Sequence, residues 1–289
     1  MLILTSAAEV TAISKEARHA GKRFGFVPTM GALHDGHLSL VRTARAQADV
    51  VVASVFVNPK QFGPTEDFSK YPRNAEKDSA MLAAEKCDYL FLPSVEEMYP
   101  AGGTTWVNVE GLSEKLDGRS RPGHFRGVTT VVAKLFNIVQ PDFAFFGQKD
   151  AAQVAIINKM VVDLNFDVRI VVCPIVREAA GLAMSSRNAY LNPDQRKQAL
   201  VLYRAVMRVQ TLADRGESNS ARLQIAGEQV MAEEAAVKPD YFEIVNRDTL
   251  EPLADISDGA LVAVAAYVGS TRLIDNVVLT GKGKAAEPR

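Results

Sequence analysis

The chain has 289 residues, of which 47% are hydrophobic and 23% charged, a composition typical of a folded globular protein. This length is enough to bury one large core or two smaller ones. The formal charge of −1 gives no overall attraction to nucleic acid or to an anionic membrane, and therefore argues against a polymeric substrate.

Short apolar runs alternate with helical patterns through the first half of the chain. Val50–Val57 is almost continuously apolar, the pattern of a strand covered on both faces. Strand–helix–strand alternation predicts an α/β fold, a Rossmann-like, doubly wound parallel sheet. The expected strands are Phe24–Val27, Val50–Val57, Tyr89–Leu92, Thr105–Val109, Phe143–Phe146 and Val168–Val172. The expected helices are Leu38–Ala48, Ala75–Glu85, Val128–Val139 and Ala151–Leu164.

The second half has a different pattern, which predicts a second, smaller α+β domain. Asn192-Pro193-Asp194-Gln195 combines an N-cap, a proline at the first helical position and a capping-box glutamine. This helix should end at Asp214, before Gly216. A helix at Ala221–Ala236 and strands at Tyr241–Val245, Leu261–Tyr267 and Leu273–Leu279 should follow. We place the domains at residues 1–176 and 177–289, and expect the polar tail Gly281–Arg289 to fray.

The most informative loop lies between the first clear strand and the next helix. It contains Met30, Gly31, Ala32, Leu33, His34, Asp35, Gly36 and His37. Ligands bind at this edge of such sheets, the glycines allow close backbone approach, and a helix start favours phosphate. The two histidines can stabilise charge on a phosphate in the transition state. The alternatives are two structural histidines or a metal pair.

Two further segments are suited to phosphate. Phe146-Gly147-Gln148-Lys149-Asp150 is again a strand end running into a helix, where Lys149 can reach phosphate and Asp150 can cap the helix or bind a ribose. Met184-Ser185-Ser186-Arg187 offers hydroxyls, backbone N–H groups and a guanidinium for a triphosphate. Taken alone, the first is equally consistent with a solvated lysine and the second with a domain linker.

The chain contains no sequence feature of secretion or membrane insertion. Its N-terminus lacks a basic leader, and its longest apolar runs are too short to span a bilayer. Its two cysteines, Cys87 and Cys173, both lie in apolar surroundings, which favours a reducing compartment. We expect a cytoplasmic protein that contacts neither membrane nor nucleic acid.

Together these segments carry a family resemblance. The early His-x-x-His loop and the Met-Ser-Ser-Arg loop resemble the paired signatures of the nucleotidyltransferase superfamily. PTMGALHDGHLSLV, SVFVNPKQFGPTEDFSKYPR, RPGHFRGVTTVVAKLFNIVQPDFAFFGQKDAAQ and GLAMSSRNAYL are similar, in order and spacing, to the signature blocks of the pantothenate synthetase family, and span residues 28–191. The resemblance implies a homodimeric ligase that condenses pantoate with β-alanine, using ATP and Mg2+, through pantoyl adenylate.

The resemblance also assigns residues to roles. It implies that the early loop binds ATP, with His37 as catalytic proton donor, His34 as its phosphate-binding companion and Lys149 as a further catalytic cation. It implies that Gln61 and Gln153 bind pantoate. Further ATP contacts are implied at Gly147, Gln148, Lys149, Asp150, Val176, Met184, Ser185, Ser186 and Arg187.

Other implications concern the metal, the lid and one departure from the family. Residues 1–176 become the nucleotide- and pantoate-binding domain, and 177–289 a lid domain. Phosphates should hold most of the magnesium shell, so no protein ligand is assigned, although Asp78 or Glu76 can help through water. Ala180 stands where the family commonly has an acidic residue, which puts the order of the Met184–Arg187 loop and the affinity for ATP in question.

Overall fold

The computed structural model describes residues 1–64 and 66–281, which form two compact units. The first unit comprises Met1–Glu114, Arg121–Gly147 and Ile156–Pro174. The second comprises Lys115–Ser120, Gln148–Ala155 and the described part of Ile175–Arg289. Apart from Gly281, the tail predicted to fray lies outside the described residues. Within the described part of the chain, no helix is both long and apolar enough to cross a bilayer.

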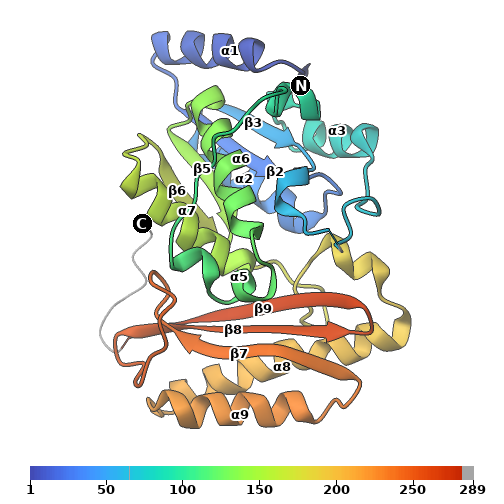
Figure 1. Cartoon of the computed structure of the whole chain (residues 1–289), viewed down its shortest axis with the longest axis vertical. Helices are drawn as coiled ribbons and strands as arrows, with labels where there is room; N and C mark the ends of the chain where they lie inside the picture. The colour runs from blue at the N-terminus through green and yellow to red at the C-terminus, as the bar shows by residue number, and fades with distance from the viewer. Residues whose placement is uncertain (65, 282–289) are drawn as a thin grey trace. The chain divides into compact units, whose positions relative to one another are not determined.

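The first unit is built on a six-stranded parallel sheet with the strand order β1-β4-β3-β2-β5-β6 (Figure 1). Its strands are β1 (Leu2–Leu4), β2 (Phe24–Thr29), β3 (Val50–Val55), β4 (Tyr89–Phe91), β5 (Phe143–Gly147) and β6 (Arg169–Cys173). From β2 the chain moves to β3 and β4 on one side, whereas from β5 it moves to β6 on the other. The order therefore reverses between the neighbouring strands β2 and β5, where doubly wound sheets bind ligands.

Helices pack on the sheet of the first unit in two sets. α1 contacts α6 and β2, whereas α2 contacts β2, β3, β5 and α3. Val41 and Ala44 of α2 are fully buried against Val51, Ala53 and other residues of the sheet. The helices are α1 (Ala7–His19), α2 (Asp35–Gln47), α3 (Ala75–Ala84), α4 (Val95–Met98) and α6 (His124–Val139), with 3-10 turns η1 (Pro59–Gln61) and η2 (Leu112–Glu114).

The structure confirms the predicted doubly wound parallel sheet and corrects two details of the first unit. Thr105–Val109 is not a strand of the sheet, because it lies along α6 instead. There the Val107 N–H donates to Thr130 Oγ1 at 3.0 Å, and the Val107 carbonyl accepts from Thr129 Oγ1 at 2.7 Å. The sequence prediction also missed β1 and α1, although Ser6 and Glu9 form a capping box at the start of α1.

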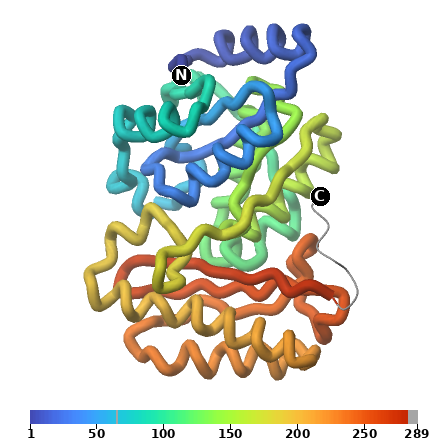
Figure 2. The backbone as a smooth tube through the Cα atoms, turned by 180° about the vertical axis from the view of Figure 1, so that it is seen from behind, coloured from blue at the N-terminus to red at the C-terminus, as the bar shows by residue number. Residues whose placement is uncertain are grey.

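The second unit is a three-stranded antiparallel sheet with two long helices on one face, as Figures 1 and 2 show from opposite sides. Alternate residues of the central strand, including Val262, Val264 and Ala266, belong to the core beneath these helices. The elements are α5 (Asp117–Ser120), η3 (Gln148–Asp150), η4 (Ser186–Tyr190), α8 (Pro193–Asp214), α9 (Ser220–Ala232), β7 (Val237–Val245), β8 (Gly259–Val268) and β9 (Thr271–Thr280). α7 (Ala151–Asp163) begins in this unit and continues in the first.

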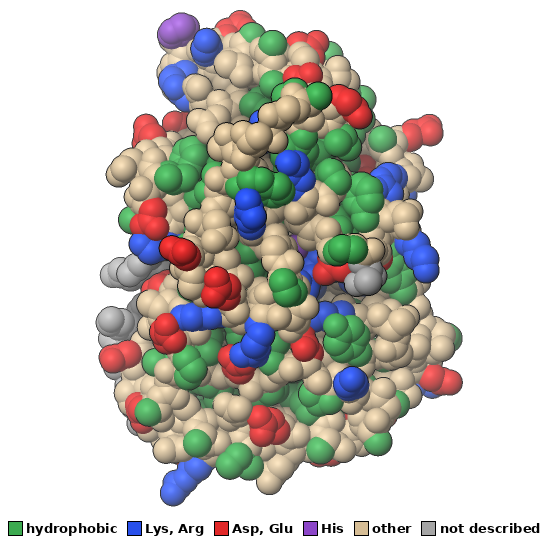
Figure 3. Space-filling model, in the orientation of Figure 1, with side chains coloured by type: hydrophobic (Ala, Val, Ile, Leu, Met, Phe, Trp, Pro, Cys, Tyr) green, Lys and Arg blue, Asp and Glu red, His purple; other side chains and the backbone are tan. Residues whose placement is uncertain are grey.

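The local signals of the second half are confirmed. Asn192 Oδ1 accepts from the Gln195 N–H at 2.9 Å, and Gln195 Oε1 accepts from the Asn192 N–H at 3.0 Å. α9 ends at Ala232, four residues earlier than expected, because residues 233–236 form the turn into β7, which starts at Val237. On the face that Figure 3 shows, acidic and basic side chains are interspersed, in keeping with a formal charge of −1.

Candidate active site

The loop after β2 turns sharply through two left-handed residues. Gly31 has φ +80°, and a Cβ there would lie 2.9 Å from Asp78 Oδ2 and 3.0 Å from Val55 Cγ1. Ala32 follows at φ +51°. Only glycine fits the first position without displacing its neighbours, because it lacks the Cβ that would collide. The turn carries the chain from β2 into the first turn of α2.

Asp78, in the first turn of α3, holds this loop in place. Its side chain is 2% exposed, and its two oxygens accept from the backbone N–H groups of Ala32 and Leu33, both at 2.9 Å. These two backbone N–H groups are therefore engaged in fixing the conformation of the loop. Because both Asp78 oxygens are engaged in this way, the carboxylate is a structural anchor for the loop. Sequence reasoning considered Asp78 only as a distant helper for magnesium.

His34 and His37 lie together where the loop becomes α2. His34 is the N-cap residue, the ring centroids are 4.1 Å apart, and the rings are tilted by 37°. The His34 backbone N–H donates to His37 Nδ1 at 3.4 Å. An accepting Nδ1 places the proton of a neutral imidazole on Nε2, so His37 can donate from that atom. Both side chains are half-buried.

Gln61 ends η1 in the same unit and is 7% exposed, so it is not exposed polar filler. Its Oε1 accepts from Asn58 Nδ2 at 3.0 Å, and its Nε2 contacts Met30 Sδ at 3.0 Å. Asn58 is buried in turn, and its Nδ2 also donates to the Gly127 carbonyl at 3.1 Å. A Cβ at Gly127 would lie 2.2 Å from the Lys60 carbonyl oxygen, so glycine lets α6 approach η1. Asn58 and Gly127 are supports for Gln61 that the sequence prediction missed.

A chain of polar groups reaches Gln61 from Glu66. Arg121 makes two hydrogen bonds of 2.7 Å to Glu66 and approaches His124 Nε2 at 2.9 Å. His124 Nδ1 lies 2.8 Å from the Gln61 carbonyl oxygen. Since that oxygen only accepts, the His124 proton sits on Nδ1. Burial alone would raise the pKa of the Glu66 carboxyl, but the hydrogen bonds and charge of Arg121 outweigh it and lower the pKa to about 2.

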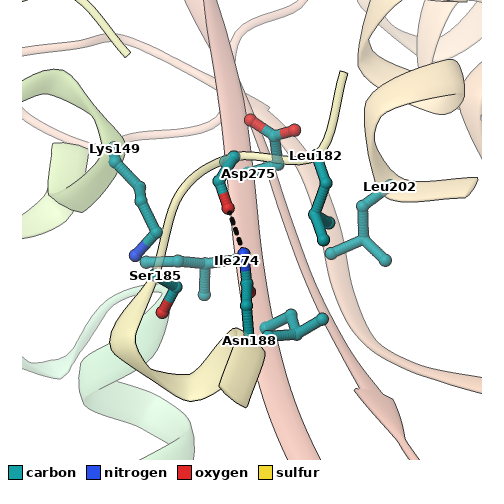
Figure 4. A pocket seen from close by; sticks show the side chains of 9 residues that line it. Lys149, Leu182, Ser185, Asn188, Leu202, Ile274 and Asp275 are labelled. Atoms are coloured by element: carbon teal, nitrogen blue, oxygen red, sulfur yellow. Dashed lines mark hydrogen bonds between the residues drawn. The ribbon is translucent and has the colours of Figure 1, made fainter. Parts of the chain in front are cut away.

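In the second unit, Lys149 and Ser185 line one small, open pocket. Figure 4 shows Lys149, from η3, and Ser185, from the loop before η4, on the same side of it. The dashed line in Figure 4 is the hydrogen bond from Asn188 Nδ2 to the Ala183 carbonyl, of 3.1 Å. Leu182, Leu202, Leu273 and Ile274 give the pocket an apolar side, and Asp275 also lines it, with its carboxylate paired to Arg177. A cation and a hydroxyl in one concavity suit phosphate oxygens.

The Met184–Arg187 segment follows a tight hairpin. Arg177 and Ala183 form an antiparallel bridge, and the Met184 N–H donates to the Val176 carbonyl at 3.0 Å. Gly181 has φ +102°, where a Cβ would lie 2.3 Å from the Tyr203 ring. Ser185 Oγ then accepts from the Arg187 N–H at 3.2 Å and caps η4. Ala180 is exposed at the tip of this hairpin.

The sequence-predicted site residues fall into two groups. The first unit contains Met30–His37, Gln61 and Gly147; the second contains Gln148–Asp150, Gln153, Val176 and Met184–Arg187. Gln153 is half-buried in the first turn of α7. Among the described residues, no cluster of three or more His, Cys, Asp or Glu side chains has the arrangement of a metal site.

Comparison with known proteins identifies the family of this chain. A family model described as pantoate-beta-alanine ligase matches residues 2–278. The chain belongs to the pantoate–β-alanine ligase family. A curated pantothenate synthetase of Koribacter versatilis is 62% identical over 289 residues, which is 100% of this chain and 99% of the relative.

Solved structures agree with the family assignment. The pantothenate synthetase of Thermus thermophilus aligns with TM-score 0.91 and 48% identity, over 96% of this chain and 99% of that one. A pantoate–β-alanine ligase of Francisella tularensis, complexed with beta-gamma ATP and β-alanine, aligns with TM-score 0.78 and 34% identity, over 96% and 97% of the two chains. The family's reaction is the ATP-dependent condensation of pantoate with β-alanine, and the chain is an enzyme of the ligase class.

Proposed function

We propose that this ligase forms pantothenate through a pantoyl-adenylate intermediate, and that the Met30–His37 loop, Lys149 and Ser185 are ATP-binding residues. The observation that carries the proposal is that Lys149 and Ser185, far apart in sequence, line one pocket. The Francisella tularensis ligase, whose structure is a complex with an ATP compound and β-alanine, adds support for the two substrates.

The segments that follow β2 and β5 both start at the point where the strand order of the first unit reverses. The carboxyl ends of β2 and β5 are neighbours in the sheet of the first unit, at its point of reversal. β2 runs into the Met30–His37 loop, and β5 runs directly into Gln148. Ligands of doubly wound sheets bind at such a point.

In the first step a pantoate carboxylate oxygen attacks the α-phosphorus of ATP. The bond from that phosphorus to the bridging oxygen breaks, and pyrophosphate leaves with the electron pair. Catalysis here consists of positioning two anions and neutralising charge. His37 donates from Nε2 to the developing charge, His34 and Lys149 bind phosphate oxygens, and Ser185, Ser186 and Arg187 bind the remainder of the triphosphate.

In the second step the neutral amine of β-alanine attacks the acyl carbon of the mixed anhydride. The bond to the AMP oxygen breaks, AMP leaves, and the nitrogen loses a proton to give the amide. Gln61 and Gln153 hold pantoate in both steps, because an amide both donates to a carboxylate and accepts from a hydroxyl. Water would hydrolyse the anhydride, so closure of residues 177–289 as a lid is part of the proposal.

Magnesium belongs to the proposal as an ion carried by the nucleotide. Mg2+ binds through one or two carboxylates and substrate phosphates in such sites, and both oxygens of Asp78 are engaged by the loop. When bound, the ion would neutralise phosphate charge. The described residues supply no cage for it.

The assay for this function is ATP–pyrophosphate exchange with pantoate alone, followed by AMP release when β-alanine is added. We expect exchange that depends on pantoate and not on β-alanine. Exchange driven instead by an amino acid or a phosphorylated alcohol would point to another nucleotidyltransferase. ATP binding with no exchange for any acid would point to a non-catalytic sensor.

We also propose that the chain works in the cytoplasm as a homodimer. Within residues 1–64 and 66–281, the backbone N–H and C=O groups of Trp106 and Asn108 have no hydrogen-bond partner, whereas those of Val107 bond to α6. This leaves one open edge that a second copy can pair with in antiparallel fashion. Sedimentation should show a dimer, and Asn108→Pro should weaken it; a monomeric wild-type chain would refute the dimer.

A further inference from the structure

Asn276, on β9 of the second unit, directs its whole side chain at η3. Its Nδ2 donates to the carbonyls of Gln148 and Lys149, at 3.0 and 2.9 Å. Its Oδ1 accepts from Gln148 Nε2 at 3.0 Å. The residue is 3% exposed, so these three bonds are made away from water. An amide has two donor hydrogens and an acceptor oxygen, and η3 engages both ends of this one.

The strand that carries Asn276 is fixed by a buried ion pair. The preceding residue, Asp275, is 3% exposed and accepts from both terminal nitrogens of Arg177, at 2.7 and 2.9 Å. Arg177 also donates to the Gly181 carbonyl at 3.0 Å, and its guanidinium lies 4.6 Å from the centre of the Tyr203 ring. Asp275 Oδ1 additionally accepts from the Asn276 N–H at 2.7 Å. The platform beneath Asn276 is thus tied to the hairpin that precedes Ser185.

We infer that Asn276 is a positioning residue for adenylation, which sets the backbone of Lys149 so that its ammonium group reaches the phosphates of ATP. The inference rests on the proposed role of Lys149. A lysine side chain is long and flexible, so the location of its backbone decides which phosphate oxygens it can reach. A displacement of about 1 Å in a catalytic group can cost roughly 10²-fold in rate.

The side chain at position 276 has to be an amide for this task. Aspartate has the same shape but presents two acceptors to the carbonyls of Gln148 and Lys149, so it repels them. Serine and alanine leave both carbonyls without their donor. Leaving these two carbonyls without their donor is unfavourable enough to move a short 3-10 turn.

The test is single-turnover formation of pantoyl adenylate in Asn276→Ala, Asn276→Asp and Lys149→Ala, and in the double variant of Asn276→Ala with Lys149→Ala. Thr271→Val is the matched control, because Thr271 is also buried on β9, at 7% exposure. We expect Asn276→Ala to lower the adenylation rate by about 10- to 100-fold, as expected for a misplaced catalytic group. The KM for pantoate should change by less than about threefold, since Asn276 is not assigned to pantoate.

The double variant separates positioning from general stability. If Asn276 acts through Lys149, Asn276→Ala should have an effect of less than about twofold when Lys149 is already alanine. Asn276→Asp, which keeps the volume of the side chain, should be as slow as Asn276→Ala. Thr271→Val should leave the rate of adenylation unchanged.

Each failure has a distinct meaning. A normal adenylation rate in Asn276→Ala or Asn276→Asp, or an equal fold-loss with and without Lys149, would overturn the inference while leaving the proposed function intact. A normal rate in Lys149→Ala would instead overturn the proposed role of Lys149. If Asn276→Ala does not fold, the Asn276→Asp variant and its combination with Lys149→Ala decide the question alone.

Discussion

Replacing Asp78 by alanine should release the Met30–His37 loop. The change removes the acceptor of two backbone N–H bonds of 2.9 Å, at Ala32 and Leu33, in a site where Asp78 is 2% exposed. Hydrogen bonds to a charged group contribute roughly 1.5–3 kcal/mol each. We take the lower end of this range, about 3 kcal/mol for the pair, because alanine also relieves the cost of burying the carboxylate.

This energy converts into a loss of affinity. If ATP binds only the ordered loop, apparent affinity falls with the fraction of molecules in which the loop is ordered. Since about 1.4 kcal/mol corresponds to tenfold, the Asp78→Ala variant should bind ATP up to about 10²-fold more weakly. Isothermal titration calorimetry with a non-hydrolysable ATP analogue measures this directly. The ATP affinity of Asp78→Asn should lie between those of the wild-type chain and Asp78→Ala, because an amide keeps one acceptor but turns an N–H toward the other donor.

Glu76→Ala is the matched control, since Glu76 lies in the same turn of α3 but is exposed. It should bind ATP like the wild-type chain. Unchanged ATP affinity in Asp78→Ala, with the fold intact by circular dichroism, would refute the reasoning. Equal losses of ATP affinity in Asp78→Ala and Glu76→Ala would show that the negative charge of these side chains matters, and not the anchoring of the loop.

Three further predictions follow from the first unit. His37→Ala should lower adenylation by about 10²–10³-fold, and near-normal single-turnover formation of pantoyl adenylate would exclude the role of proton donor. Gln61→Ala should raise the KM for pantoate more than the KM for ATP. Equal increases of both KM values in steady-state kinetics would count against pantoate binding by Gln61. Glu66 has a pKa of about 2 in the fold against an ordinary 4.5, so its share of stability is present above pH 4.5 and is lost as the pH falls toward 2. Between pH 4.5 and 2, unfolding of Glu66→Gln should therefore take up about one proton fewer than unfolding of the wild-type chain. An unchanged slope of the unfolding free energy against pH would contradict the pairing with Arg121.

Local signals were sufficient for most elements but not for the pairing of strands. Asn192-Pro193-Asp194-Gln195 predicted the start of α8 correctly, because a capping box acts within one turn of helix. Thr105–Val109 has strand propensity yet lies along α6, bonded to two threonine side chains. Propensity describes what a segment can adopt, whereas the neighbours that satisfy its backbone are chosen by the whole fold.

The sequence by itself determined the doubly wound sheet, the smaller α+β unit and the family, because periodicity, caps and motif spacing are properties of the linear chain. The tertiary structure alone decided which side chains hold the candidate site residues. Asp78 anchors Ala32 and Leu33 from α3, His124 of α6 bonds to the carbonyl of Gln61, and Asn276 bonds to the carbonyl of Lys149 from β9. Each of these contacts joins a side chain to a backbone or amide group on a different segment, and no local pattern encodes such a partner.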